Sequence, residues 1–145
     1  MPFINRRTTQ LKATQSLTTA TATLTTNDSG KTYFLNLITG IAITLPAPTD
    51  GVEFTFIVGT SPTTANSGTG YVITNSAGTS GDNIVGHVLS AGGAAGDVES
   101  TLGGDAVNFV ADSAVLGDRV HLISDGTNWY AVANTAVAGG VTITG

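Results

Sequence analysis

Short runs of alternating apolar and polar residues dominate this chain. The clearest run is Val52–Val58 (VEFTFIV), in which the valines and phenylalanines fall on one side and Glu53 and Thr55 on the other. Alternation with a period of two is typical of a β-strand that buries one of its faces. We therefore expect Phe54 and Phe56 to lie in a hydrophobic core.

Similar runs recur along the chain, and none shows the period of an amphipathic helix. A Thr-rich strand is expected within Leu17–Thr26, because threonine suits a pleated strand. The remaining predicted strands are Lys31–Leu37, Ile41–Leu45, Tyr71–Thr74, Asn83–Leu89, Ala106–Ala111, Asp118–Ile123, Thr127–Ala133 and Val141–Thr144. This pattern predicts an all-β, single-domain antiparallel β-sandwich or barrel, jelly-roll-like in type, with an extended N-terminal arm.

Two Asp-Gly turns predict how neighbouring strands pair. Asp50-Gly51 precedes Val52–Val58, and Ser124-Asp125-Gly126 precedes Thr127–Ala133. Asp-Gly between alternating apolar runs is a strong hairpin signal. Each of these two strands is therefore expected to pair antiparallel with the strand before it. The uneven strand spacing argues against a β-helix.

Two further features refine the predicted fold. Ser90–Gly104 is rich in Ala and Gly and is expected to form a flexible excursion. Trp129 and Tyr130 are adjacent in a predicted strand and must face opposite sides of it, and we expect Trp129 to face the core.

Charge is segregated along the sequence. All ten carboxylates lie from Asp28 onward, whereas the residues before Asp28 include three cations and no acid. The segment up to Asn27 therefore carries +3 and the remainder, with two cations against ten acids, carries −8, which gives the net charge of −5. We expect a basic arm, residues 1–16, to lead an acidic β-rich body, residues 17–145.

The arm carries residues suited to holding a partner. Phe3 and Ile4 provide an apolar anchor, and Arg6 and Arg7 can form bidentate hydrogen bonds with carboxylates. Lys12 adds a third cation. We expect these five residues to bind a partner surface; the alternative is an ordinary mobile chain end.

Composition narrows the class of partner. Only 10% of the residues are charged, against roughly 25% in an average domain. Sparse charge suits faces covered by a partner or by further copies of the chain, although Thr-rich solvent faces would show the same composition. The negative net charge argues against nucleic acid as the main partner.

The cysteine content and the lengths of the apolar runs argue against disulfides, thiolate metal sites, a signal peptide and a membrane span. The chain has no cysteine, so disulfides and thiolate metal ligands are excluded. No apolar run reaches the length of a signal-peptide core or a membrane span. We expect synthesis in the cytoplasm and no membrane partner.

No constellation of residues predicts an active site. Asp118, His121 and Ser124 are close in sequence, but the pattern lacks a nucleophile elbow, and His121 and Ser124 should point to opposite strand faces. Asp97 and Glu99 would share a face of an extended segment, yet their Gly-Ala setting lacks aromatic sugar platforms. We therefore predict a protein that is not an enzyme, with no catalytic, cofactor-binding or metal-binding residues.

Several segments of the body together resemble a known group of proteins. They are Asp28–Asn36 (DSGKTYFLN), Ile41–Pro48 (IAITLPAP), Gly51–Val58 (GVEFTFIV), Gly117-Asp118 and Ser124–Tyr130 (SDGTNWY). This set resembles small structural proteins of tailed bacteriophages, in particular the capsid decoration, or cement, proteins. The resemblance covers most of the body from Asp28 to about Ala133. The closing DGTNWY element is also similar to segments of phage tail-fibre proteins.

The resemblance implies a virion structural protein, commonly a homotrimer, made in the host cytoplasm. Such a protein binds the outer capsid surface, bridges major capsid subunits and stabilises the head against internal DNA pressure. Extended termini often reach onto the capsid in this family, so the major capsid protein is the implied partner of the arm. The alternative is a tail-fibre or receptor-binding module, with Tyr71, Trp129 or Tyr130 at an exposed glycan site.

Overall fold

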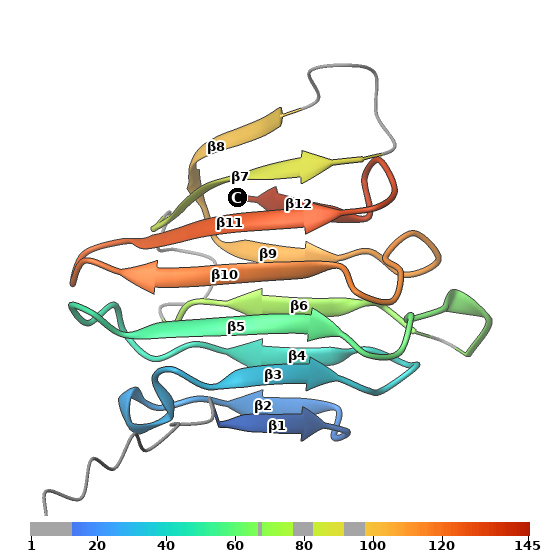
Figure 1. Cartoon of the computed structure of the whole chain (residues 1–145), viewed down its shortest axis with the longest axis horizontal. Coiled ribbons are helices and arrows are strands. Elements are labelled where there is room, and N and C mark those ends of the chain that lie inside the picture. Colours follow the sequence, from blue (N-terminus) through green and yellow to red (C-terminus); the bar gives the residue numbers. More distant parts are fainter. Residues whose placement is uncertain (1–12, 67, 77–82, 92–97) are drawn as a thin grey trace, which may run out of the picture.

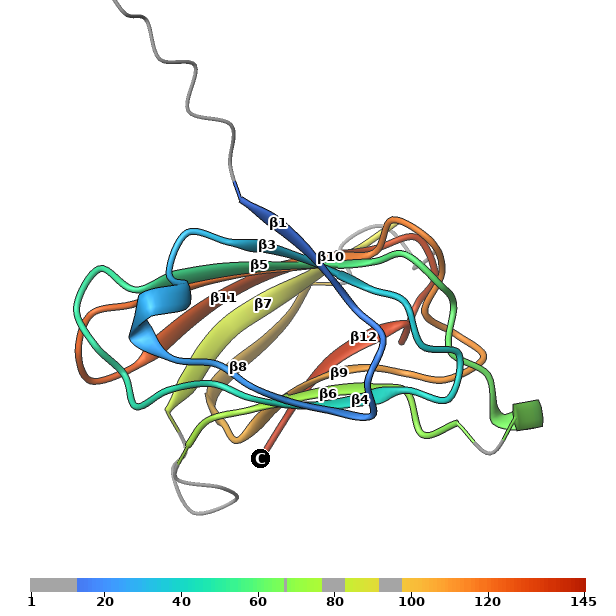
Figure 2. The same cartoon turned by 90° about the horizontal axis from the view of Figure 1, so that it is seen from below.

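Two β-sheets pack face to face in the computed structural model, which describes residues 13–66, 68–76, 83–91 and 98–145 (Figures 1 and 2). The strands are β1 (Thr14–Leu17), β2 (Thr21–Thr23), β3 (Thr32–Leu35), β4 (Ile41–Thr44), β5 (Glu53–Val58), β6 (Tyr71–Thr74), β7 (Ile84–Ser90), β8 (Val98–Gly104), β9 (Ala106–Phe109), β10 (Arg119–Ser124), β11 (Trp129–Thr135) and β12 (Val141–Thr144). Two short 3₁₀ helices, η1 (Thr26–Asp28) and η2 (Thr64–Asn66), lie in connections. The prediction of an all-β sandwich is confirmed.

One sheet has seven strands and the other has five. The seven-stranded sheet has the order β1-β3-β5-β10-β11-β7-β8, and the five-stranded sheet has the order β12-β9-β6-β4-β2. Both sheets mix parallel and antiparallel pairs. The expectation of a purely antiparallel sandwich was therefore wrong.

The parallel pairs arise from the way the first six strands wind around the core. Successive strands alternate between the sheets, so that β1, β3 and β5 are parallel neighbours in one sheet and β2, β4 and β6 in the other. Parallel neighbours need a crossover connection, and here the opposite sheet supplies it. The first six strands therefore wind as in a β-helix, contrary to the expectation from the uneven strand spacing.

The two Asp-Gly turns form different kinds of connection. Asp50-Gly51 carries the chain from β4 in one sheet to β5 in the other, so the predicted hairpin at this turn is not formed. Ser124-Asp125-Gly126 does join an antiparallel hairpin, β10 with β11, as predicted. A sandwich corner and a hairpin both need a chain reversal, and the local turn chemistry does not distinguish them.

The core lies between the sheets and follows the predicted alternation. Phe54, Phe56 and Trp129 are fully buried, as expected. The Tyr33 ring stacks on Phe56 with centroids 5.5 Å apart, and the Trp129 ring lies 5.8 Å from that of Phe54. Burying each aromatic side chain contributes about 2 kcal/mol or more of hydrophobic free energy, so this cluster stabilises the contact between strands far apart in sequence.

Three predicted segments differ from the structure by more than two residues at an end. Residues 14–16 of the expected arm lie in edge strand β1, and of Leu17–Thr26 only Thr21–Thr23 is a strand after β1 ends at Leu17. Within the expected excursion at residues 90–104, Val98–Gly104 forms β8 against β7, while residues 92–97 lie outside the described part of the chain. Pairing with a neighbouring strand overrides the weak strand propensity of Gly and Ala.

Candidate functional site: the outer face of the seven-stranded sheet

The predicted partner-binding residues Phe3, Ile4, Arg6, Arg7 and Lys12 all lie outside the described residues. The chain enters the described part at Ala13, whose carbonyl oxygen accepts a hydrogen bond from the Thr32 amide at 3.0 Å. Residues 1–12 therefore join the body at the start of β1, the edge strand of the seven-stranded sheet.

The solvent-facing side of this sheet is the broadest feature that could hold a partner. Its strands align their outward residues in cross-strand rows, which together we call the outer face. The rows are Glu53, Ile123, Tyr130 and Val85; Thr32, Thr55, His121, Val132 and His87; and Phe34, Ile57, Arg119, Asn134 and Leu89.

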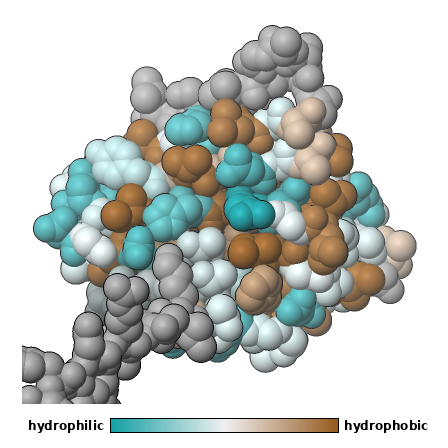
Figure 3. Space-filling model, viewed as in Figure 1, coloured by the Kyte–Doolittle hydropathy of each residue, from teal (hydrophilic) through white to brown (hydrophobic). Residues whose placement is uncertain are grey.

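Half of these positions carry large apolar side chains. Five of them, Phe34, Leu89, Ile123, Tyr130 and Val132, are 37–43% exposed, so they are open to solvent while packed against their row neighbours. Glu53 and Arg119 are the only Asp, Glu, Lys or Arg residues in the three rows. Figure 3 views this side of the molecule and shows apolar and hydrophilic side chains interspersed across it. This frequency of exposed apolar side chains on one face favours an interaction site.

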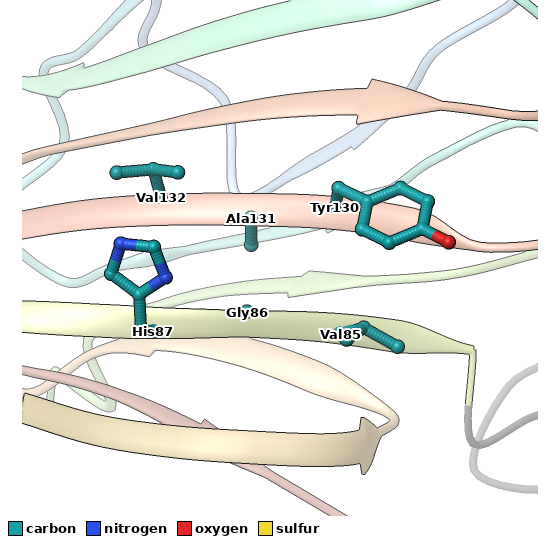
Figure 4. A pocket seen from close by; sticks show the side chains of 6 residues that line it. All are labelled: Val85, Gly86, His87, Tyr130, Ala131 and Val132. Atoms are coloured by element: carbon teal, nitrogen blue, oxygen red, sulfur yellow. The ribbon is translucent and has the colours of Figure 1, made fainter.

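A shallow hollow of about 230 Å³ lies on the outer face between β7 and β11 (Figure 4). Val85, His87, Tyr130 and Val132 form its sides, and its lining is mostly apolar. Gly86 and Ala131 complete the lining. A Cβ atom at Gly86 would collide with the Ala131 carbonyl oxygen, so only glycine allows the two strands to approach so closely here.

Three acidic residues, Asp50, Glu53 and Asp125, belong to neighbouring backbone segments at one end of the outer face, and we call them the acidic corner. The Gly51 amide donates a hydrogen bond to the Ser124 carbonyl at 2.9 Å, which brings the two turns that carry Asp50 and Asp125 together. Glu53 lies beside Ile123 in the same cross-strand row. The corner therefore presents negative charge next to the apolar rows.

Hydrogen bonds hold the Asp125 carboxylate in place. The amides of Asn128 and Thr127 each donate to its Oδ1 at 2.8 Å, and the Tyr130 hydroxyl donates to Oδ2 at 3.0 Å. These bonds, the Asn128 amide first among them, lower the pKa of Asp125 below its ordinary value. Asp125 therefore stays negatively charged throughout the neutral and mildly acidic range.

The three residues weighed as a hydrolytic triad do not form one. His121 faces outward, with Nδ1 3.1 Å from Thr55 Oγ1 and Nε2 3.5 Å from Glu53 Oε2, whereas Ser124 is buried on the opposite face of the strand. Asp118 is also buried and accepts hydrogen bonds from Thr135 Oγ1 and the Ala136 amide. Asp118 therefore fixes the end of β11 rather than orienting His121.

Two of the three aromatic residues considered for an exposed glycan site, Tyr71 and Trp129, cannot form one. Tyr71 and Trp129 are both fully buried, and the Tyr71 hydroxyl donates to the Leu35 and Thr60 carbonyls inside the sandwich. Tyr130 alone of the three named aromatics is exposed. Asp97 lies outside the described residues, and the side chain of Glu99 is not among those described.

Other site classes find little support in the described ranges. No three His, Cys, Asp or Glu side chains there gather closely enough to hold a metal ion. Nor does this part of the chain contain a helix that is long and apolar enough to cross a membrane. Comparisons with protein-family models, curated proteins and solved structures found no match to this chain.

Sequence reasoning missed the outer face. The signal was present, because the β10 and β11 segments carry apolar residues on both sides: Val120 and Leu122 point inward, while Ile123 and Val132 point outward. A strand that is apolar on both faces predicts either burial on both faces or an exposed apolar face.

Proposed function

We propose that this chain is a non-enzymatic virion structural protein of a tailed phage. It binds the outer capsid surface and stabilises the head by bridging major capsid subunits. One observation carries the proposal: the outer face is wide, rich in exposed apolar side chains and nearly free of charge. A protein that acts by attachment needs such a face, and the resemblance of the body to capsid decoration proteins supplies the kind of partner.

The attachment has two parts. Ile123 and Val132 lie on β10 and β11, neighbouring strands in the middle of the sheet, and would be buried against the capsid. Arg6 and Arg7 would pair with carboxylates of the major capsid protein. The apolar part favours contact, and the arginines select an acidic surface. A homotrimer would present three such faces, so that modest contacts combine into firm attachment.

Binding of the purified chain to assembled heads that lack it tests the proposal. The wild-type chain is expected to co-sediment with heads in a saturable manner. The double variant Ile123→Lys/Val132→Lys should bind about tenfold more weakly or worse, because it places two cations where apolar area would be buried. The matched control is Ala42→Lys, an exposed position on the outer side of the five-stranded sheet, which should leave binding unchanged.

The role of the arm needs a separate variant. A chain that lacks residues 1–12 is expected to lose head binding while its circular dichroism spectrum stays that of the folded body. Full head binding by this truncation would refute the arm as an anchor. Unchanged binding by the double lysine variant would refute the outer face as the contact surface.

A tail-fibre or receptor-binding module is the second candidate. The observation that favours it is the exposed ring of Tyr130 on the rim of the hollow, where a sugar ring could stack. Glycan-array binding that disappears in Tyr130→Ala, together with reduced adsorption to host cells, would support this function. Silence on the array and normal adsorption would count against it.

A further inference from the structure

The outer face begins at the edge where residues 1–12 join the body. Thr14 opens β1 beside Thr32, and Thr32 lies beside Thr55 of β5. These three strands run parallel, so residues that precede Thr14 approach the sheet from the end at which Glu53 and the rest of the acidic corner lie. The chain therefore reaches the face at its negatively charged end.

Charge is complementary between this segment and that end of the face. Residues 1–12 contain Arg6, Arg7 and Lys12 and no acid. The nearest described cation, Lys31, is engaged with Asp28 at 2.6 Å. The cation of the outer face itself, Arg119, lies in the row furthest from the corner. The carboxylates of the corner thus have His121 near Glu53 but no lysine or arginine partner among the described residues.

Residues 1–12 are long enough to reach both the acidic corner and the hollow. Neighbouring strands are about 4.8 Å apart, which places Glu53 about 10 Å and the β11–β7 hollow about 20–25 Å from β1. An extended chain covers about 3.3 Å per residue, so from Ala13 the arginines reach about 20 Å and Phe3 about 33 Å. The cations come first along the path and the aromatic ring comes last, in the same order as the corner and the hollow.

The hollow also fits the ring. Its volume of about 230 Å³ exceeds the roughly 150 Å³ in which an apolar protein cavity accommodates a benzene molecule. Val85, Val132 and the Tyr130 ring offer it apolar and aromatic contacts. A phenylalanine side chain is therefore a suitable occupant.

We propose that, in the free protein, residues 1–12 lie across the outer face of their own chain, with Arg6 and Arg7 at the acidic corner and Phe3 in the hollow. The tether supplies a high effective concentration, so individually weak contacts suffice to hold the segment. The docked segment covers apolar surface that would otherwise invite self-association. Docking concerns the free chain and does not depend on which partner the face later binds, but any such partner must displace the segment.

Paramagnetic broadening in nuclear magnetic resonance spectra tests this proposal on the full chain. The chain contains no cysteine, so Asn5→Cys introduces a single site for a nitroxide label. At low salt the label should broaden the amide signals of Val85, Gly86 and Val132. It should leave those of Ala42 and Asn108, in the five-stranded sheet, sharp. Adding about 0.5 M NaCl should restore much of the lost intensity, because salt screens the arginine–carboxylate attraction.

Variants and a mixed sample distinguish this arrangement from docking that does not need the arginines and from docking of a second copy's segment. Arg6→Gln/Arg7→Gln should abolish the broadening, whereas the matched cation control Arg119→Gln should retain it. Arg6→Glu/Arg7→Glu should also abolish it, and adding Asp50→Lys/Glu53→Lys should restore it. In a mixture of nitrogen-15-labelled chain without nitroxide and unlabelled chain with nitroxide, no broadening is expected.

Three results would overturn the proposal. One is the absence of broadening around the hollow at low salt. Another is equal broadening with and without Arg6 and Arg7. The third is strong broadening in the mixed sample, which would show that a second copy's segment, and not the chain's own, occupies the face.

Discussion

The Tyr130 hydroxyl donates a hydrogen bond to Asp125 Oδ2 at 3.0 Å, and this bond joins the rim of the hollow to the acidic corner. Both residues belong to the β10–β11 hairpin, in which Ile123 and Tyr130 lie side by side. One short hairpin therefore contributes apolar surface, an aromatic rim and a fixed negative charge to the same face. The exposed apolar side chains and the fixed charge therefore belong to one structural element.

Removing the Tyr130 hydroxyl should change the Asp125 carboxylate only slightly. The amides of Asn128 and Thr127 are the larger causes of its lowered pKa, and Tyr130→Phe leaves both in place. We expect the pKa of Asp125 to rise a little and to stay below its ordinary value, as carboxyl carbon chemical shifts against pH would show. A return to the ordinary value would mean that the tyrosine, and not the turn, holds the charge.

The Asp28–Lys31 pair should give an acid-dependent contribution to stability. Hydrogen bonds from Lys31 and Thr25 lower the pKa of Asp28 from 3.8 to about 2. Because the folded pKa is the lower one, the stabilisation is complete above pH 4 and is lost as the pH falls through about 2. We expect it to be about 1 kcal/mol, since the pair lies near the surface.

Urea unfolding followed by the fluorescence of the buried Trp129 measures this contribution. The difference in unfolding free energy between wild type and Asp28→Asn should be present at pH 6 and vanish near pH 2. Asp50→Asn, at an exposed residue for comparison, should change stability by less than about 0.5 kcal/mol at either pH. A stability difference that grows on acidification would contradict a lowered pKa of Asp28 in the folded protein.

Asp118 should be among the most sensitive polar residues of the fold. Its buried carboxylate accepts hydrogen bonds from the Val115 amide at 3.0 Å and from Thr135 Oγ1 and the Ala136 amide at 2.9 Å each. Asp118→Ala leaves these donors without their acceptor, which should cost about 2–4 kcal/mol of unfolding free energy. A loss below about 1 kcal/mol in chemical denaturation would show that water replaces the carboxylate.

Substitutions at Gly40 and Gly117 should distinguish the free-energy cost of backbone strain from that of steric collision. Gly40 and Gly117 both have φ of 93°, but a Cβ atom at Gly40 would collide with the Gly70 carbonyl, whereas at Gly117 it would meet open space. Gly117→Ala should cost about 1 kcal/mol from strain alone. Gly40→Ala should cost about 3 kcal/mol or more, because β4 and β6 must also move apart. Equal losses in thermal or urea unfolding would contradict the predicted close approach.

Much of the strand pattern could be predicted from the sequence, because period-two alternation directly reports which side of a strand is buried. Tyr71–Thr74 was predicted with its exact bounds, and Phe54, Phe56 and Trp129 were placed in the core. The winding of the first six strands could not be predicted. The Asp50-Gly51 turn specifies a reversal of the chain, but whether the next strand pairs locally or crosses to the other sheet depends on contacts distant in sequence.

The candidate site was harder to predict for a related reason. Ile123 and Val132 are apolar residues in predicted strands, and composition alone would place them inside. Their exposure follows from register, since Val120 and Leu122 already fill the inward positions of β10. The acidic corner combines residues from separate turns, which only the fold brings together.

Immunogold electron microscopy of virions from the source of this chain, with antibody raised against the purified protein, would show directly whether the protein decorates capsids. Gold should be distributed over the outside of the heads. Gold confined to the tails, or absent from the virions, would contradict capsid decoration.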